Sequence, residues 1–184
     1  MDMQAVPGKS PVVGVVLGSD SDLPVLTPGL EILEKWDVPF EVQILSAHRT
    51  PTEAANYAAT ARERGLKVII AAAGMAAHLP GVLAAYTTLP VIGVPIASGE
   101  LRGIDALYAM VQMPPGIPVA TVGIGAGKNA ALLAVELLGL ADPVWYHKLE
   151  AYRKEQAKGV LDKNTKLQKL GYHGYLARAK EAGK

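Results

Sequence analysis

Short runs of apolar residues, several rich in valine and isoleucine, recur along this chain with helix-length segments between them. Strands of a parallel sheet appear as such runs because helices bury both faces of the sheet. The alternation therefore predicts β-α-β units and an α/β fold with a parallel five-stranded sheet. The predicted strands are 12–17, 40–45, 68–73, 91–96 and 119–124.

Signals for helix ends place helices between these runs. One helix opens at Pro51 and closes before Gly65, a pairing of proline and glycine that is typical of helix ends. Two more are predicted at 104–111 and at 129–140. The segment 129–140 is apolar nearly all round, so we expect it to be covered on most sides.

The helix after the first strand is less regular, because Pro24 and Pro28 both fall near its expected start. A proline inside a helix removes a backbone hydrogen bond. We therefore predict the regular part of this helix at 28–36, with Thr27 as a candidate cap.

The pattern changes after residue 141. Trp145, Leu149 and Tyr152 form an apolar stripe at helical spacing, and the following residues are basic with scattered glycines. This pattern predicts a helix that docks on a neighbouring subunit, or packs on its own domain, followed by a mobile basic tail. The chain thus divides into an N-terminal tail, a main α/β domain and a C-terminal helical extension, at 1–11, 12–141 and 142–184.

Composition excludes several classes of function. The net charge is +1, whereas proteins that bind nucleic acid usually carry a clustered basic excess. There are no cysteines, which excludes disulfides, thiolate metal sites and cysteine nucleophiles. No apolar stretch reaches the roughly 18 residues of a membrane-spanning helix, and no signal peptide is recognisable. We expect a cytoplasmic protein that binds neither nucleic acid nor membrane.

Polar side chains gather where the predicted strands end. Ligands of open parallel sheets bind at the carboxyl ends of the strands, and two of the four histidines follow strands in this way. The sequence therefore predicts a ligand site at this edge of the sheet. The loops concerned are 18–22, 46–51, 74–81, 97–103 and 125–129.

The first two loops contain groups that suit a phosphate. The Gly-Ser-Asp sequence around Ser19 is also a common capped turn, but a serine at a helix start, with free backbone amides, favours an anion. Arg49 in the next loop can add a two-pronged charged contact. Together these residues predict a phosphate cradle.

The loop histidines His48 and His78 are candidates for proton transfer, since imidazole titrates near neutral pH. His48 lies between a small residue and Arg49, and it is either catalytic or a surface histidine. His78 lies in a loop whose glycines, such as Gly74, let backbone approach a flat ligand. It is either a ligand contact or a helix-start histidine bonded to a neighbour.

Three common ligand motifs fail on spacing. The glycine-rich segment 123–128 is not a P-loop, because Val122 and Asn129 stand where glycine and Ser or Thr are required. The segment 18–22 lacks the glycine fingerprint of dinucleotide-binding folds. No His, Asp and Glu spacing indicates a metal site.

Taken in order, five segments resemble the signature blocks of the carboxyaminoimidazole ribonucleotide mutase family. The resemblance extends from about residue 12 to 140, and each block lies at a predicted strand exit or helix start. The blocks are Gly-Ser-Asp-Ser-Asp at 18–22, Ser-Ala-His-Arg-Thr-Pro at 46–51, Ala-Ala-His-Leu-Pro-Gly at 76–81, Gln-Met-Pro-Pro-Gly-Ile-Pro-Val at 112–119 and Asn-Ala-Ala-Leu-Leu-Ala at 129–134.

This resemblance implies a flavodoxin-like three-layer sandwich, assembled as a homo-octamer, without metal or organic cofactor. It implies a small-molecule substrate of purine biosynthesis, 5-(carboxyamino)imidazole ribonucleotide, whose carboxylate passes from the exocyclic nitrogen to a ring carbon, with CO₂ as the intermediate. His48 would transfer protons, and Asp22 would hold the ribose. The phosphate would be held by Ser19, Ser46 and Arg49, and the rest of the substrate would be met by Gly74, Ala76, His78 and Ser98.

The chain departs from that family at several positions. Ala72 and Met75 stand where more glycine is expected, and Ala97 replaces a glutamine. The loop before Asn129 is shorter than usual. The sequence Lys128-Asn129 resembles that of a related branch of the family, which carboxylates aminoimidazole ribonucleotide directly with CO₂. Arg49 and the Ala-His pair at 77–78 favour the mutase over that carboxylase.

A non-enzymatic phospho-receiver domain shares the flavodoxin-like topology and is an alternative of another class. Asp20, Asp22 and Lys128 satisfy part of its pattern, but no aspartate ends the third predicted strand. A flavin-binding module is a weaker alternative, which the colour of the purified protein would reveal.

Overall fold

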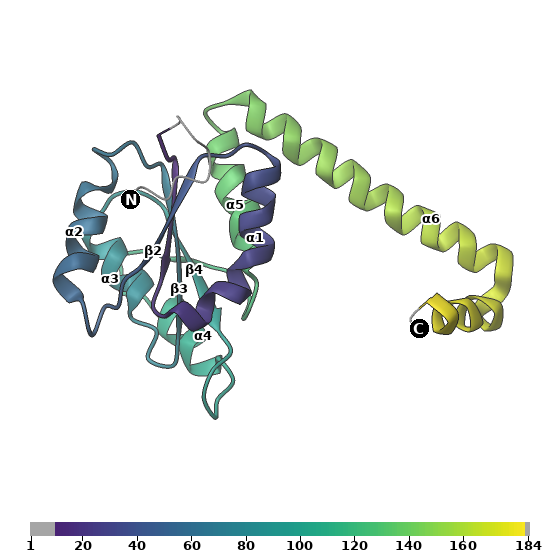
Figure 1. The fold of residues 1–184 in the computed structure, drawn as a ribbon, viewed down its shortest axis with the longest axis horizontal. Helices are drawn as coiled ribbons and strands as arrows, with labels where there is room; N and C mark the ends of the chain where they lie inside the picture. The colour runs from purple at the N-terminus through teal and green to yellow at the C-terminus, as the bar shows by residue number, and fades with distance from the viewer. Residues whose placement is uncertain (1–9, 183–184) are drawn as a thin grey trace.

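A parallel sheet with the strand order β2-β1-β3-β4-β5 forms the centre of the protein (Figure 1). The computed structural model describes residues 10–182. All neighbouring strands pair in parallel, so the predicted flavodoxin-like sheet is confirmed. The strands are β1 (Val13–Leu17), β2 (Phe40–Ile44), β3 (Val68–Gly74), β4 (Val91–Ile96) and β5 (Ala120–Thr121).

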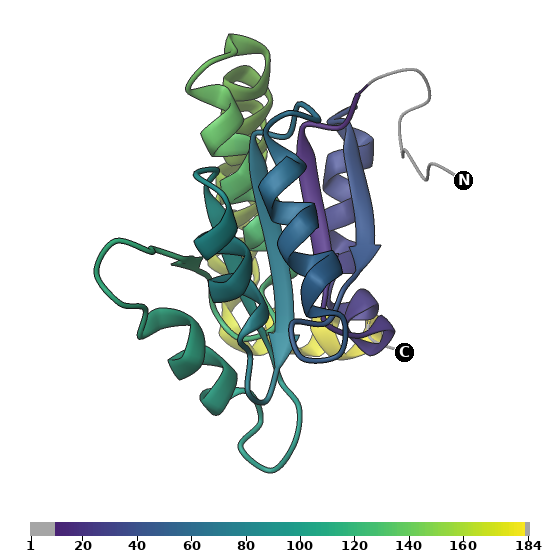
Figure 2. The same cartoon turned by 90° about the vertical axis from the view of Figure 1, so that its left-hand side faces the viewer.

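Helices cover both faces of the sheet and complete three layers (Figures 1 and 2). One face packs against α1 (Leu23–Lys35), α5 (Gly127–Gly139) and the start of α6 (Pro143–Ala182). The other face packs against α2 (Pro51–Ala61), α3 (Leu79–Tyr86) and α4 (Ile104–Val111). Because both faces are covered, the strands β1, β3 and β4 are buried almost throughout.

Helix α1 begins at Leu23, so the predicted start at residue 28 was wrong. Pro24 lies in the first turn, where its missing amide is not needed, and Pro28 is accommodated inside the helix. Thr27 is not a cap: it lies within α1 and donates its hydroxyl to the Leu23 carbonyl at 3.0 Å. Burial of Leu26 against the sheet outweighs the one backbone bond that Pro28 removes.

Helices α1 and α5 approach each other closely through glycines. A Cβ atom on Gly29 would lie 2.5 Å from the Gly127 carbonyl oxygen, and one on Gly127 would meet the backbone of Val25. The predicted apolar helix is thereby covered by α1, by the sheet and by the first turns of α6. The predicted fifth strand was too long, since only Ala120 and Thr121 pair as a strand.

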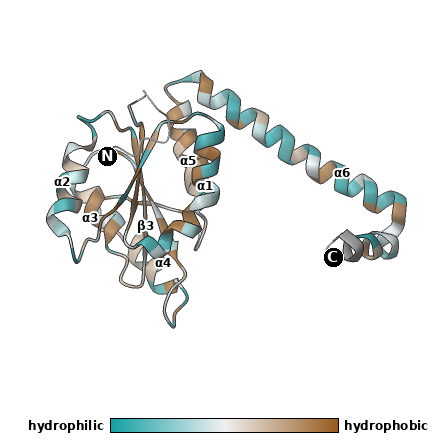
Figure 3. Ribbon diagram, viewed as in Figure 1, coloured by the Kyte–Doolittle hydropathy of each residue, from teal (hydrophilic) through white to brown (hydrophobic). Residues whose placement is uncertain are grey.

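The C-terminal segment, for which a docking helix and a mobile basic tail were predicted, is helical through Ala182. Its first turns pack on their own domain, where Leu149 is buried and Arg153 pairs with Glu136. Gly171, with φ 63° and ψ 167°, divides α6 into two helical segments. Most of α6 projects away from the sandwich with a largely hydrophilic surface (Figures 1 and 3).

Most of the predicted N-terminal tail, and residues 183–184, lie outside the described residues. Within residues 10–182, none of the helices has the length and apolar character needed to cross a membrane.

Candidate active site

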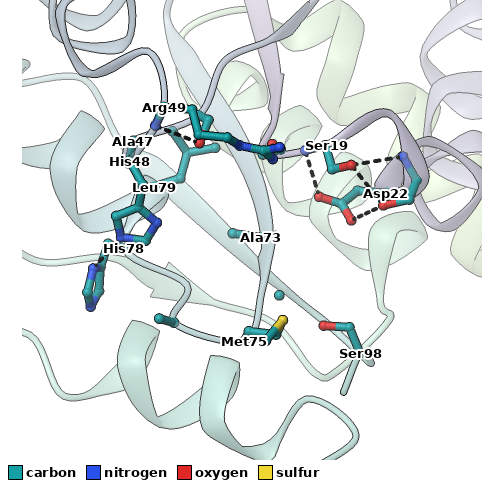
Figure 4. A pocket seen from close by; sticks show the side chains of 15 residues that line it. Ser19, Asp22, Ala47, His48, Arg49, Ala73, Met75, His78, Leu79 and Ser98 are labelled. Atoms are coloured by element: carbon teal, nitrogen blue, oxygen red, sulfur yellow. Dashed lines mark hydrogen bonds between the residues drawn. The ribbon is translucent and has the colours of Figure 1, made fainter.

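The loops after β1, β2, β3 and β4 enclose a cavity of about 550 Å³ at the carboxyl ends of the strands (Figure 4). β1 is the switch point of the sheet, because the chain turns to β2 on one side and to β3 on the other. Every residue that the sequence predicted for the site lines this cavity. These residues are Ser19, Asp22, Ser46, His48, Arg49, Gly74, Ala76, His78 and Ser98.

The turn after β1 is locked by reciprocal caps. The Ser19 hydroxyl accepts a hydrogen bond from the Ser21 amide at 3.3 Å, and the Asp22 carboxylate accepts one from the Ser19 amide at 3.2 Å. These two hydrogen bonds form a capping box at the start of the short 3₁₀ helix η1 (Asp20–Asp22). The turn is therefore a helix cap that also presents Ser19 and Asp22 to the cavity.

Asp22 is a buried carboxyl group on the cavity wall. Burial raises its pKa above the ordinary value for aspartate, and the hydrogen bond from the Ser19 amide opposes that shift. A carboxylate in this position can accept hydrogen bonds from ligand hydroxyl groups.

The turn after β2 is held together by Ser46 and Thr50. The Ser46 amide donates to the Thr50 hydroxyl at 2.9 Å, and the Thr50 amide donates to the Ser46 carbonyl at 2.8 Å. The Arg49 amide donates to the Ser46 hydroxyl at 3.2 Å. The Arg49 guanidinium, whose Nη2 lies 3.5 Å from the Gly18 carbonyl oxygen, reaches across to the turn after β1 (Figure 4). Ser19, Ser46 and Arg49, which the sequence grouped as a candidate anion cradle, thus line one cavity.

His48 and His78 meet at the cavity. Nε2 of His48 lies 2.8 Å from Nδ1 of His78, and the rings meet edge to face with centroids 4.9 Å apart. One nitrogen must donate and the other accept, so the two tautomers are coupled. His78 also stands at the start of α3, so it is both a helix-start histidine and a cavity residue.

The wall after β3 and β4 is formed by small residues and one methionine. A Cβ atom on Gly74 would collide with the Ser98 hydroxyl oxygen, so a larger residue at 74 would require the Ser98 side chain to move. The Ser98 hydroxyl is buried and makes no hydrogen bond within residues 10–182. The amides of Ala77 and His78 already donate to the carbonyls of Met75 and Ala76, each at 2.8 Å. These two amides are therefore engaged within the loop itself.

Some cavity residues were not predicted. Ser21 and Met75 line the cavity as well; Ser21 stood in a recognised loop, and Met75 was noted only as a departure from glycine. Lys128, which had suggested direct carboxylation, does not line the cavity, and its ammonium group lies 5.6 Å from the centre of the Tyr152 ring. In the described part of the chain, no three His, Asp or Glu residues are grouped as a metal site would require.

The arrangement has an anion cradle in one region and paired imidazoles in another, with a buried carboxyl group beside the cradle (Figure 4). A cavity of about 550 Å³ has the size of a small-molecule site. The fold and site therefore define a flavodoxin-like α/β protein whose small-molecule-sized cavity is lined by an arginine, a buried carboxyl group and two imidazoles.

Comparison with known proteins identifies the family. The family described as AIR carboxylase matches residues 12–159, and the chain belongs to this family. A Synechocystis protein named N5-carboxyaminoimidazole ribonucleotide mutase is 55% identical over 167 residues, covering 91% of this chain and 95% of that protein. A Pyrococcus abyssi protein of the same name is 56% identical, covering 90% and 95%.

A fungal relative shows the same unit inside a longer protein. The Candida albicans protein named phosphoribosylaminoimidazole carboxylase is 53% identical over 168 residues, which cover 91% of this chain and 30% of that protein. Among solved structures, Treponema denticola PurE superposes with a TM-score of 0.77 at 27% identity, over 85% of this chain and 98% of that one. Sequence and fold thus agree on the family.

Proposed function

We propose that this protein converts 5-(carboxyamino)imidazole ribonucleotide into 5-amino-1-(5-phosphoribosyl)imidazole-4-carboxylate, an isomerisation in purine biosynthesis. The observation that carries the proposal is the His48–His78 pair in the same cavity as the cradle of Ser19, Ser46 and Arg49. Family membership and the names of the bacterial and archaeal relatives support the same activity.

The phosphate of the substrate would bind in the cradle. Arg49 provides a planar, permanently charged donor, and the serine hydroxyls provide neutral donors around it. Asp22 would accept hydrogen bonds from the ribose hydroxyls, because it is a buried carboxylate that lines the same cavity as the cradle. With both ends of the ribose phosphate fixed, the imidazole ring would extend toward His48.

The histidine pair would supply the proton chemistry. His48 donates a proton to the exocyclic nitrogen as the bond from that nitrogen to the carboxyl carbon breaks, which releases CO₂ and leaves the neutral amine. Ring carbon 4 then attacks CO₂, and the same imidazole takes the proton that carbon 4 loses. One proton is given and one is recovered, so the net reaction is an isomerisation. Holding CO₂ beside the carbon raises its effective concentration.

Direct carboxylation of aminoimidazole ribonucleotide by CO₂ is the alternative reaction, and the name of the Candida albicans relative is consistent with it. The position of Lys128 beside Tyr152 argues against it, because this lysine was the residue that suggested the carboxylase. Arg49 in the cradle also favours the mutase.

We further propose that the protein assembles as a homo-octamer in which the projecting part of α6 packs on a neighbouring subunit. Val160 and Leu161 are 65% and 64% exposed on that helix, far from the sandwich that buries Leu149. Covering such apolar side chains with a partner removes them from water, which favours association. Mass measurement of the native protein by light scattering, with a Val160→Asp and Leu161→Asp variant, would show a smaller assembly if this is correct.

Two rate measurements test the reaction. Purified protein is given 5-(carboxyamino)imidazole ribonucleotide without bicarbonate, and separately aminoimidazole ribonucleotide with saturating CO₂. Fast conversion of the first alone establishes the mutase. Efficient turnover of the second substrate alone makes the protein a carboxylase. If neither substrate is converted, the proposed function is wrong.

A further inference from the structure

Met75 has a backbone conformation that is unusual for its side chain. Its φ angle is 53°, in the left-handed region that normally favours glycine. The other non-glycine residues with positive φ within residues 10–182 are Asp37 and Arg102, and aspartate is a residue type that tolerates this region. A methionine there carries an energetic cost that glycine would avoid.

Packing within the chain does not offset that cost. The Met75 side chain is 59% exposed although it lines the cavity. By contrast, Met110 on α4 is 1% exposed in the core. A strained, exposed residue at a ligand cavity is the combination expected where strain serves function.

The side chain lies where it can cover one end of the cavity. Its Cγ atom is 3.7 Å from the position that a Cβ atom on Gly99 would take, so it bridges the loops after β3 and β4. Ser98 lines the same cavity as Met75, and its buried hydroxyl makes no hydrogen bond within residues 10–182. The Met75 side chain is flexible enough to change its position when a ligand enters.

We propose that Met75 is a specificity-determining residue that folds over the bound imidazole ring and retains CO₂ between its release and its recapture. The inference rests on the proposed mutase function. An unbranched, polarisable thioether packs well against a flat ring, and it excludes water from the reacting carbon. The unpaired hydroxyl of Ser98, which lines the same cavity, can donate to the carboxylate oxygens.

The first test measures how often CO₂ escapes. Each escape leaves aminoimidazole ribonucleotide instead of the carboxylated product. The ratio of aminoimidazole ribonucleotide to carboxylated product, corrected for decarboxylation without enzyme, therefore measures how often CO₂ escapes. In Met75→Gly and Met75→Ala we expect this ratio to rise by at least about threefold, since water and CO₂ exchange more freely. The alanine variant keeps a Cβ in the left-handed conformation, which separates loss of the thioether from relief of strain.

Asp37→Gly is the matched control, because it relieves a similar φ of 55° in the α1–β2 turn, outside the cavity. Its product ratio should equal that of the wild type. A wild-type ratio in both Met75 variants would overturn the role of Met75 while leaving the mutase intact. Failure of the wild-type enzyme to form any carboxylated product would instead remove the proposed function.

The second test does not depend on turnover. Mild peroxide oxidises accessible methionines, so Met75 in the free protein should react much faster than Met110, as read by mass spectrometry of peptides. Saturation with the carboxylated product should slow Met75 oxidation by about tenfold or more if the ring covers it. Unchanged oxidation in the complex, or a protected Met75 in the free protein, would contradict the proposal.

Discussion

His48 and His78, which are 30 positions apart in the sequence, lie with Nε2 and Nδ1 only 2.8 Å apart. The turn after β2 holds the first ring and the start of α3 holds the second. The pairing fixes which nitrogen of His48 is engaged, and Nδ1 of His48 makes no hydrogen bond within the described residues. A substrate can therefore exchange a proton at that nitrogen while His78 steadies the ring.

Replacing the proposed proton donor should stop the reaction without unfolding the protein. We expect His48→Asn to lower kcat by about 10²–10⁴-fold, the usual contribution of a positioned acid or base. KM and the melting temperature should change little, because His48 is exposed and lies outside the anion cradle. His147→Asn, at an exposed histidine on α6, is the control. An activity above a tenth of the wild-type value in His48→Asn would contradict the assignment.

Arg49 should act on binding rather than on chemistry. Its replacement by alanine removes a charged hydrogen-bond donor worth about 1.5–3 kcal/mol, so KM should rise by roughly ten- to hundredfold with a smaller change in kcat. Arg62→Ala is a matched control, since that arginine bonds to Thr88 at 3.0 Å outside the cavity. Equal effects of the two substitutions on KM would show that Arg49 does not hold the phosphate.

The close contact of α1 with α5 predicts a stability change that is independent of function. In Gly29→Ala the new methyl group would lie 2.5 Å from the Gly127 carbonyl oxygen. We expect the free energy of unfolding to fall by about 1–3 kcal/mol, the usual cost of overpacking. Gly159→Ala has nothing within 4 Å of its new methyl group. It lies in a helix and should be neutral or stabilising by up to about 1 kcal/mol. Urea unfolding of both variants tests the pair.

Sequence reasoning worked best where a residue's role depends on its local pattern. The apolar runs located β1 to β4 to within one residue, and for β1, β3 and β4 the reason is that strands buried on both faces leave little choice of side chain. The strand exits predicted the cavity residues, since parallel strands place their carboxyl ends at one edge.

What the sequence did not reveal depends on contacts between distant segments. The start of α1 was misplaced because the packing of Leu26 outweighs the loss of one hydrogen bond at Pro28. The His48–His78 bond could not be foreseen, because no local pattern fixes the distance between two loops. The left-handed backbone at Met75 was likewise hidden, since nothing in a methionine indicates a positive φ.

The buried carboxyl group of Asp22 predicts how stability depends on pH. Burial raises its pKa in the folded protein, while the unfolded chain has the ordinary value near 3.8. The folded state therefore takes up a proton at higher pH than the unfolded state, so this group destabilises the protein at neutral pH and does so less as the pH falls through its folded pKa.

Asp22→Asn removes this titration and keeps a side-chain oxygen that can accept from the Ser19 amide. At pH 7 we expect the variant to have a higher free energy of unfolding than the wild type, and the difference should shrink toward pH 4 as the wild-type carboxyl is protonated. All other carboxyl groups are common to both proteins and cancel in the comparison. KM should rise by about three- to tenfold, because a neutral acceptor holds the ribose hydroxyls less strongly. Urea unfolding of both proteins at several pH values tests the expected stability difference. A difference in unfolding free energy that is constant or grows on acidification would show that burial does not raise the pKa of Asp22.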